Sequence, residues 1–214
     1  MRLVVITDIL TQHRFSHREL VQLAIRGGAD TIQLREKHMK TQQLLAITQE
    51  ISQWCKEAKV RFIVNDRVDI AFLCDADGIH LGQDDLPISS ARKILGSQKT
   101  IGGTAATLEQ ALEVERQGAD YVGFGHVFPT SSKVKTGSPK GVSELKRVCQ
   151  ALKIPVVAIG GIHLGNIKSV MEAGPGGIAV CGAVCRADNP EIATKTLKDY
   201  LNLSSQKIPL VSKF

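Results

Sequence analysis

The stretch YVGFGHVFPTSSK, residues 121–133, changes character about one third of the way along. Its first five residues, 121–125, are apolar or small, which is typical of a strand buried in a sheet. The remainder brings a histidine, three hydroxyl side chains and a lysine to the carboxyl end of that strand. In parallel α/β folds this end of a strand is where ligand sites form.

Seven further short runs, rich in β-branched and apolar residues, have the same strand character. They are residues 3–7, 31–35, 61–65, 78–82, 100–104, 155–160 and 177–182. Amphipathic segments of helical length lie between most of them, at 17–28, 41–58, 107–118, 142–153 and 165–174. Three of these segments end in glycine, as helix C-termini often do.

This alternation predicts an α/β fold, a single-domain (β/α)8 TIM barrel spanning residues 1–203. A doubly wound open sheet is the alternative. Residues 204–214 are predicted to form a C-terminal tail with an apolar patch.

The composition fits a globular protein, with 43% hydrophobic residues in a chain of 214 and a mean hydropathy near zero. The net charge of +6 is compatible with phosphorylated small-molecule ligands, but on charge alone it indicates a solvated basic surface. Scattered basic residues and only 4% aromatic residues argue against nucleic-acid binding. No apolar run approaches the roughly 18 residues of a membrane span, and Asp8 interrupts the first apolar run, which argues against a signal peptide. Five cysteines without a CxxC spacing predict reduced thiols and a cytoplasmic protein.

Cationic and amide side chains follow the strand at 31–35. Gln33, Arg35 and Lys37 alternate along the chain, so an extended backbone directs all three toward the same side. Inside a barrel such groups need a compensating anion. The alternative is an ion pair that involves Arg35, Glu36 and nearby acids.

Carboxylates follow the next two strands, where Asn65 and Asp66 precede Asp84 and Asp85. Two carboxylates from adjacent strand ends, completed by phosphate oxygens and water, suit Mg²⁺. Asp66 alone is also a candidate helix N-cap.

Glycines follow the last two strands, in AIGGIHLGN (158–166) and GIAVCGAV (177–184). In TIM barrels a phosphate commonly binds at these positions, where main-chain N–H groups can approach it closely. Glycine also serves simply to turn the chain. The mouth of the predicted barrel is therefore expected to take two anionic groups, one of them with its own Mg²⁺.

An ordered series of motifs resembles the thiamine phosphate synthase family, within the thiamine phosphate synthase and thiazole tautomerase superfamily. The motifs are QLREK (33–37), VNDRVDIA (64–71), ADGIHLGQDDLP (76–87), GADYVGFG (118–125), VFPTSSK (127–133) and IPVVAIGGI (154–162). The resemblance implies a Mg²⁺-dependent transferase of thiamine biosynthesis. Such an enzyme couples 4-amino-2-methyl-5-hydroxymethylpyrimidine diphosphate to hydroxyethylthiazole phosphate and releases diphosphate.

The resemblance also implies roles for individual residues. The pyrimidine diphosphate would be bound by Gln33, Leu34, Arg35, Glu36, Lys37, Asn65, Thr104 and Lys133. The thiazole phosphate would be bound by Thr130, Ser131, Ser132, Gly161, Cys181 and Gly182. Asp66 and Asp85 would bind Mg²⁺, while Arg35, Lys37 and Lys133 would stabilise the leaving diphosphate. A homodimer is expected by analogy with similar barrels.

Some positions depart from the family pattern. His126 stands where synthases more often have proline, and it is similar to the histidine that transfers a proton in thiazole tautomerases. A tautomerase with His126 as acid and base is therefore an alternative, although the two metal aspartates favour the synthase. Thr104 and Ala106 differ from the usual serine and its neighbour, and Gly182 replaces a common serine. A third possibility is a regulatory barrel that binds phosphorylated ligands without turnover.

Overall fold

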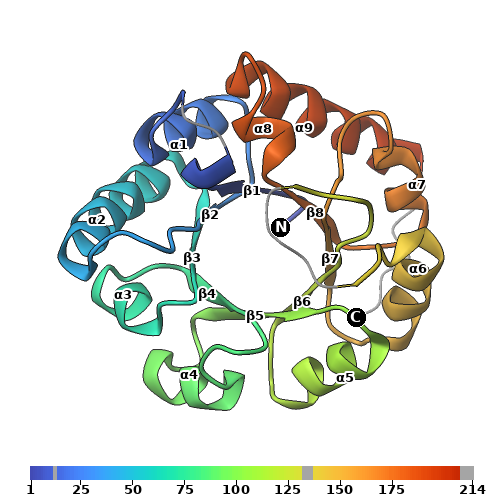
Figure 1. The fold of residues 1–214 in the computed structure, drawn as a ribbon, viewed down its shortest axis with the longest axis horizontal. Helices are drawn as coiled ribbons and strands as arrows, with labels where there is room; N and C mark the ends of the chain where they lie inside the picture. Colours follow the sequence, from blue (N-terminus) through green and yellow to red (C-terminus); the bar gives the residue numbers. More distant parts are fainter. Residues whose placement is uncertain (12–13, 132–136, 208–214) are drawn as a thin grey trace.

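The structure, a computed structural model, describes residues 1–11, 14–131 and 137–207. Eight parallel strands close into a barrel in chain order, with helices around the outside (Figure 1). The strands are β1 (Leu3–Thr7), β2 (Thr31–Leu34), β3 (Arg61–Asn65), β4 (Gly78–Leu81), β5 (Thr100–Ala105), β6 (Tyr121–Phe124), β7 (Val156–Ile159) and β8 (Gly177–Val180). The predicted barrel is thus confirmed, and the open sheet is wrong because β1 pairs with β8 through Leu3 and Ile178.

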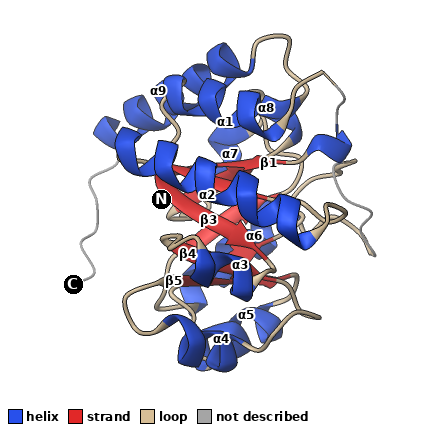
Figure 2. Ribbon diagram, turned by 90° about the vertical axis from the view of Figure 1, so that its left-hand side faces the viewer, coloured by secondary structure: helices blue, strands red, loops and turns tan. Residues whose placement is uncertain are grey.

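The helices follow the strands and form a ring around them (Figure 1), and in the side view they lie above, in front of and below the strands (Figure 2). They are η1 (Ile9–Thr11), α1 (His17–Arg26), α2 (Thr41–Ala58), α3 (Val68–Leu73), α4 (Ile88–Leu95), α5 (Leu108–Arg116), α6 (Gly141–Ala151), α7 (Ile167–Glu172), α8 (Gly182–Cys185) and α9 (Pro190–Lys207). The glycines expected after α1, α5 and α7 have positive φ angles, at Gly28, Gly118 and Gly174. They end these helices because the left-handed conformation costs glycine little.

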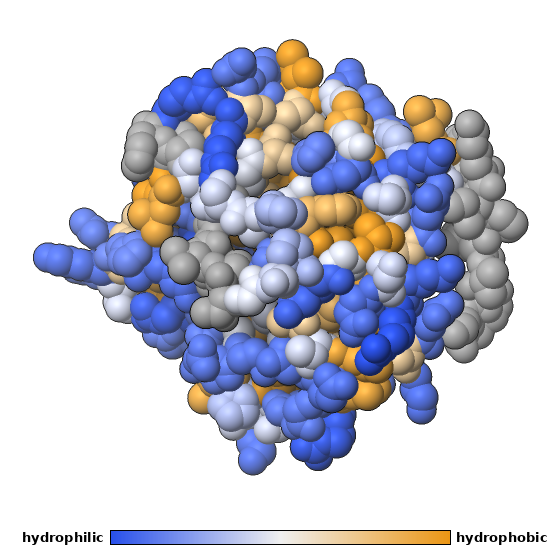
Figure 3. Space-filling view, turned by 45° about the vertical axis from the view of Figure 1, so that its right-hand side comes forward, coloured by the Kyte–Doolittle hydropathy of each residue, from blue (hydrophilic) through white to orange (hydrophobic). Residues whose placement is uncertain are grey.

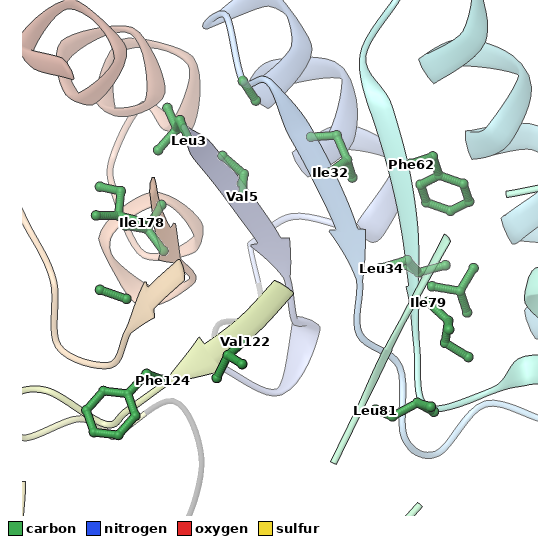
Figure 4. Close-up of a cluster of buried hydrophobic side chains, with 14 of the residues drawn as sticks. Leu3, Val5, Ile32, Leu34, Phe62, Ile79, Leu81, Val122, Phe124 and Ile178 are labelled. Carbon is green, nitrogen blue, oxygen red and sulfur yellow. The ribbon is translucent and has the colours of Figure 1, made fainter. Parts of the chain in front are cut away.

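Alternating strand residues build two separate apolar layers. Outward-facing side chains such as Val5, Ile32 and Leu34 pack under the helices (Figure 4), and all three are at most 1% exposed. Burying one such side chain contributes about 1.5–3 kcal/mol. Inside the barrel lies a smaller cluster that includes Val4 and Tyr121 and reaches the mouth at Ile6 and Ala179. The structure places polar residues toward the mouth, where the carboxyl ends of the strands open.

Helix α9 belongs to the barrel because it packs against α1, α8 and β1. The contact with α1 is close: a Cβ at Gly27 would lie 2.6 Å from the Thr194 Cβ. Helix α9 runs to Lys207, so residues 204–207 of the predicted tail are helical, while 208–214 lie outside the described residues. The division of the chain at residue 203 stays a prediction.

Hydrophilic side chains cover most of the face shown in Figure 3, and hydrophobic side chains appear there in separate patches. None of the helices in the described part of the chain combines the length and the apolar character that crossing a membrane requires.

Candidate active site

The segment after β2 carries the first group of site residues, and its side chains alternate as expected. Gln33 and Arg35 line a cavity of about 90 Å³ inside the barrel. Leu34 packs in the outer apolar layer, and the Glu36 carboxylate binds His17 of α1. Leu34 and Glu36 therefore direct their side chains away from the interior. Only their main-chain atoms could therefore contact a ligand in the mouth, because the side chains of successive residues in an extended segment point in opposite directions.

A buried hydrogen-bond network holds this segment in place. His17 Nε2 lies 3.1 Å from Glu36 Oε2, and His17 Nδ1 lies 2.9 Å from Thr7 Oγ1. Glu36 Oε1 accepts hydrogen bonds from the main-chain N–H groups of His38 and Met39 at 2.6 and 3.1 Å. Burial lowers the pKa of His17. Burial opposes ionisation of Glu36 as well, but its hydrogen bonds to His38, His17 and Met39 together lower its pKa.

The two cations of this segment are each paired with a carboxylate. Arg35 pairs with Asp8, which follows β1 and is only 2% exposed. Lys37 pairs with Asp66, which follows β3. The alternative prediction of an ion pair at Arg35 is thus correct in kind, but its partner is Asp8 and not Glu36. Sequence reasoning missed Asp8, although its position directly after a buried strand is the same signal that identified Asp66.

Asp66 and Asp85 lie side by side at the ends of β3 and β4. Burial and a hydrogen-bonding contact with the Asp85 carboxyl raise the pKa of Asp66, while Lys37 opposes the shift. Asp85 is fixed by a 2.6 Å hydrogen bond from the Gly82 N–H to its Oδ2. The helix-cap alternative for Asp66 is wrong, since the N-cap of α3 is Arg67. Asp84 is exposed.

The carboxylate pair fits a hard divalent cation. Ionised Asp66 and Asp85 repel one another, and a cation between them would relieve that repulsion. Within the described ranges no group of three or more His, Cys, Asp or Glu side chains could hold a metal. A cation bound here would therefore take its remaining oxygen ligands from water or from a bound ligand, as Mg²⁺ commonly does.

Thr104 on β5 belongs to a buried polar chain within the barrel. Its Oγ1 lies 2.9 Å from His80 Nε2, and His80 Nδ1 lies 2.9 Å from the Tyr121 hydroxyl. Burial raises the pKa of Tyr121, so this phenol is protonated and can donate to His80. Asn65 lines the same cavity of about 90 Å³. The interior thus presents hydroxyl, imidazole and amide groups at one depth, as recognition of a polar ring requires.

A larger cavity of about 550 Å³ lies beneath the loops that follow β6, β7 and β8. All described residues expected to bind the thiazole phosphate line it: Thr130, Ser131, Gly161, Cys181 and Gly182. Ser132 and Lys133 lie outside the described residues. Ile6, Arg35, Ile159 and Ala179 line both this cavity and the interior one, so the two cavities meet beside Arg35.

Arg186 also lines this cavity, and sequence reasoning missed it. Its Nη1 donates to Ser131 Oγ at 2.7 Å, and its Nε donates to the Thr11 carbonyl at 3.0 Å. The signal available in the sequence was an arginine two residues after the glycine-containing motif 177–184.

The glycine pair after β7 lets two loops come into contact. Gly160 and Gly161 have φ angles of 100° and 65°. A Cβ on Gly160 would lie 2.6 Å from His126 Cα, and one on Gly161 would lie 2.4 Å from the Pro129 carbonyl oxygen. These glycines therefore shape the cavity by admitting the loop after β6, besides lining its wall.

His126 is held at the base of that loop. It is 6% exposed, and its carbonyl accepts a 2.9 Å hydrogen bond from the Lys140 N–H. Along the described part of the loop, the cavity wall runs from Phe128 to Ser131. His126 is therefore not among the described residues of the wall, but it packs closely against Gly160, which is.

Four of the five cysteines do not suit a nucleophilic role, and the fifth, Cys185, is buried and has a pKa that its hydrogen bond with Cys181 lowers. A hydrogen bond with Cys185 and burial raise the pKa of Cys181, the one that lines the cavity. Burial raises the pKa of Cys55 and Cys149 to about 12 and that of Cys74 to about 11. Thiols protonated at neutral pH are weak nucleophiles.

Comparison with known proteins agrees with this geometry. Residues 3–184 match the family model described as thiamine monophosphate synthase. The thiamine-phosphate synthase of Salinibacter ruber is 51% identical over 90% of this chain and 85% of its own length. That of Chloroflexus aurantiacus is 43% identical over 96% and 95% of the two chains.

A solved structure gives the same result. The thiamine phosphate pyrophosphorylase of Pyrococcus furiosus superposes with a TM-score of 0.87 at 40% identity, over 95% of this chain and 96% of its own. The 3-hexulose-6-phosphate synthase structure, at 22% identity and a TM-score of 0.71, shares the fold. On its motifs, its barrel and these matches, the chain belongs to the thiamine monophosphate synthase family.

Proposed function

We propose that the protein is a thiamine-phosphate synthase, a transferase that joins 4-amino-2-methyl-5-hydroxymethylpyrimidine diphosphate to hydroxyethylthiazole phosphate and releases diphosphate. One observation carries this proposal beyond family membership. Asp66 and Asp85 lie in contact beside Lys37, and a cavity of about 550 Å³ opens next to them past Arg35. This arrangement supports a charged site for diphosphate and a separate site for a second phosphorylated molecule.

The diphosphate would bind by exchange of partners. Arg35 and Lys37 already lie at the mouth, but each is neutralised by a carboxylate. A diphosphate that arrives with a cation supplies anionic oxygens to Arg35 and Lys37 and a positive charge to the acids. Gln33 and Asn65, which line the interior cavity, would add amide hydrogen bonds. Each charge keeps an opposite partner throughout, which limits the cost of desolvation.

Asp66 and Asp85 would hold Mg²⁺ together with diphosphate oxygens. When bound, the metal would offset negative charge on the diphosphate that leaves. The residues of the chain that act on the same charge are Arg35 and Lys37, and by family resemblance Lys133. They accelerate the reaction to the extent that they bind the departing diphosphate more tightly than the intact substrate.

The bond changes need no nucleophile from the protein. The C–O bond between the pyrimidine methylene and the diphosphate breaks, and its electron pair leaves with the diphosphate. The thiazole nitrogen lone pair forms the new C–N bond to that methylene. The raised pKa of Cys181, the cysteine in the cavity wall, agrees with a site that works by positioning and charge stabilisation.

The pyrimidine ring would occupy the interior cavity. Thr104, His80 and Asn65 present polar groups there, and Tyr121 buttresses the His80 ring at a centroid distance of 5.5 Å. The thiazole phosphate would occupy the larger cavity, with Thr130 and Ser131 hydroxyls and the main chain near Gly161 and Gly182 as donors. Their shared wall at Arg35 is where the two reacting atoms would meet.

The tautomerase alternative depends on His126 reaching a substrate. His126 is 6% exposed and is not among the described residues that line the cavity, and the Asp66–Asp85 pair has no evident use in a proton shift. We therefore assign His126 a positioning role in which it supports Gly160 and the loop after β6. The synthase remains the function that these observations favour.

A coupling assay tests the proposal. Both substrates are incubated with the protein in Mg²⁺ and in excess chelator, and thiamine phosphate and diphosphate are quantified. We expect equal amounts of both products, with Mg²⁺ required. Binding of the substrates without product would favour the regulatory barrel. Aromatisation of the thiazole carboxylate phosphate tautomer, lost in His126→Ala, would favour the tautomerase.

A further inference from the structure

Arg186 occupies a position that joins three loops of the mouth. It follows α8, and its guanidinium reaches the Thr11 carbonyl after β1 and the Ser131 hydroxyl after β6. It lines the cavity of about 550 Å³ together with the glycine pair after β7. The guanidinium therefore stands in the wall of the cavity next to the two hydroxyls expected to bind phosphate.

The charge of Arg186 has no carboxylate partner among the residues that the structure describes. Its neighbour Arg14, by contrast, pairs with Asp188 at 3.0 Å. Among the described residues of the cavity wall the one carboxylate is Asp8, and that group already pairs with Arg35. Arg186 is exposed, and its described side-chain partners are a carbonyl and a hydroxyl, so it brings to the wall a positive charge that no described carboxylate neutralises. Such a charge favours an anionic ligand.

Arg186 also has unused N–H donors, and its main chain is held in place by hydrogen bonds. Of the five N–H donors of a guanidinium, its contacts with the described residues use two. Its main-chain N–H donates to the Gly182 carbonyl at 3.2 Å, and its carbonyl accepts from Arg14 Nη2 at 2.8 Å. A guanidinium held in this way is suited to bind a phosphate with two parallel hydrogen bonds.

The residues expected to bind the thiazole phosphate carry no positive charge of their own. Gly182 has no side chain to donate, and Thr130 and Ser131 supply neutral hydroxyls only. A phosphate dianion in a partly enclosed cavity needs a cation. We propose that Arg186 binds the phosphate group of the thiazole substrate and thereby selects the phosphorylated thiazole over the free alcohol. The inference rests on the proposed function, since that function supplies the substrate.

The experiment compares two ligands that differ only in the phosphate. Hydroxyethylthiazole phosphate and hydroxyethylthiazole are titrated calorimetrically into the wild-type protein, Arg186→Gln and Arg186→Lys. We expect Arg186→Gln to bind the phosphate roughly 10- to 100-fold more weakly, the effect of one charged hydrogen-bonded pair. The affinity of Arg186→Gln for the alcohol should change less than about three-fold. The affinity of Arg186→Lys for the phosphate should lie between those of the wild type and Arg186→Gln, because lysine keeps the positive charge but cannot donate two parallel hydrogen bonds.

Two controls separate the causes. Arg116→Gln removes the same charge from an exposed pair with Glu113 on α5, and it should leave both affinities unchanged. The KM for the pyrimidine diphosphate should be unchanged in Arg186→Gln, since Arg186 lines only the larger of the two cavities beside Arg35.

Equal losses for the two thiazole compounds would show that Arg186 merely ties loops together, and they would overturn the inference about Arg186 alone. So would an unchanged affinity for the phosphate. A wild-type protein that binds neither thiazole compound would overturn the proposed function along with this inference.

Discussion

The two halves of the barrel mouth are built from different groups. Around β1–β4, side chains of opposite charge meet in pairs, Arg35 with Asp8 and Lys37 with Asp66. Around β6–β8, glycines let main-chain segments approach one another, and the only carboxylate in the described wall is Asp8. The first half can change partners when a charged ligand and a metal arrive, whereas the described part of the second half is shaped by close main-chain packing.

Because of this difference, we expect mutations in the two halves of the mouth to have different effects. Removing the charge of Lys37 or Asp66 should impair catalysis more than stability, because Lys37 is 36% exposed and the buried Arg35–Asp8 pair stays intact in both cases. Adding a methyl group in the second half should impair the fold, because packed main chain cannot move aside cheaply. Four substitutions test this division.

The largest effect is expected for Asp66→Asn in the charged half. Asp66 has a φ of 65°, and asparagine tolerates this left-handed conformation better than alanine would. Loss of the carboxylate should lower kcat/KM roughly 1000-fold at a fixed Mg²⁺ concentration. Thermal unfolding should show no loss of stability, since the repulsion from Asp85 is relieved.

The control for Asp66→Asn is Asp69→Asn, which removes a carboxylate that is 56% exposed and pairs with Arg67. Its activity should stay within about two-fold of wild type. Equal activities in the two variants would contradict the assignment of Asp66 to the metal.

The second effect is on stability in the glycine half. Gly160→Ala should lower the free energy of unfolding by about 3 kcal/mol, because the new Cβ would lie 2.4 Å from His126 Cβ at a positive φ. Gly118→Ala is the matched control, with a φ of 88° and nothing within 4 Å of the new Cβ. It should cost only about 1 kcal/mol. Urea titration of both variants decides whether close packing accounts for the difference.

The third effect separates ligand binding from metal binding. Lys37→Met should lower kcat/KM for the pyrimidine diphosphate roughly 10- to 100-fold, because an ionic hydrogen bond to the diphosphate is lost. Mg²⁺ affinity without diphosphate should increase, since Lys37 no longer competes for Asp66. Lys40→Met on the exposed chain before α2 is the control. A joint loss of diphosphate and Mg²⁺ affinity in Lys37→Met would argue against partner exchange.

The smallest effect concerns pH and the network beneath Arg35 and Lys37. Burial lowers the pKa of His17 below its ordinary value of 6.5 in the folded protein, so the unfolded state binds more protons below that pH. The contribution of His17 to the free energy of unfolding is therefore fully present above pH 6.5, and it is lost as the pH falls through the lowered pKa. Glu36, whose pKa is also lowered, acts in the same direction at more acidic pH.

His17→Gln should lower stability at neutral pH by about 1 kcal/mol and flatten the pH dependence just below 6.5. The exposed His38→Gln serves as the control. A wild-type slope retained in His17→Gln would mean that other groups account for it.

Much of the site could be predicted because the direction of the strands decides which loops lie at the mouth of the barrel. Strand ends meet at one face of a parallel barrel, so Asp66 and Asp85 were expected to lie together, and burial with mutual contact raises the Asp66 pKa accordingly. The alternation of Gln33, Arg35 and Lys37 was likewise a local property of extended chain. The family resemblance implied that Leu34 and Glu36 contact the ligand along with Gln33 and Arg35. It did not indicate that the side chains of Leu34 and Glu36 face the helices.

By itself, the sequence determined the order of strands and helices and most of the residues that reach the mouth of the barrel, whereas the β1–β8 pairing in the structure decided that the sheet closes. The first two properties depend on local periodicity and on strand direction, which neighbouring residues decide. Only the tertiary structure decided which charges pair, why Gly160 and Gly161 must lack side chains, and that Arg186 enters the cavity wall. Such contacts join residues far apart in the chain, as Arg186 and Ser131 do, and their distances depend on how the whole barrel packs.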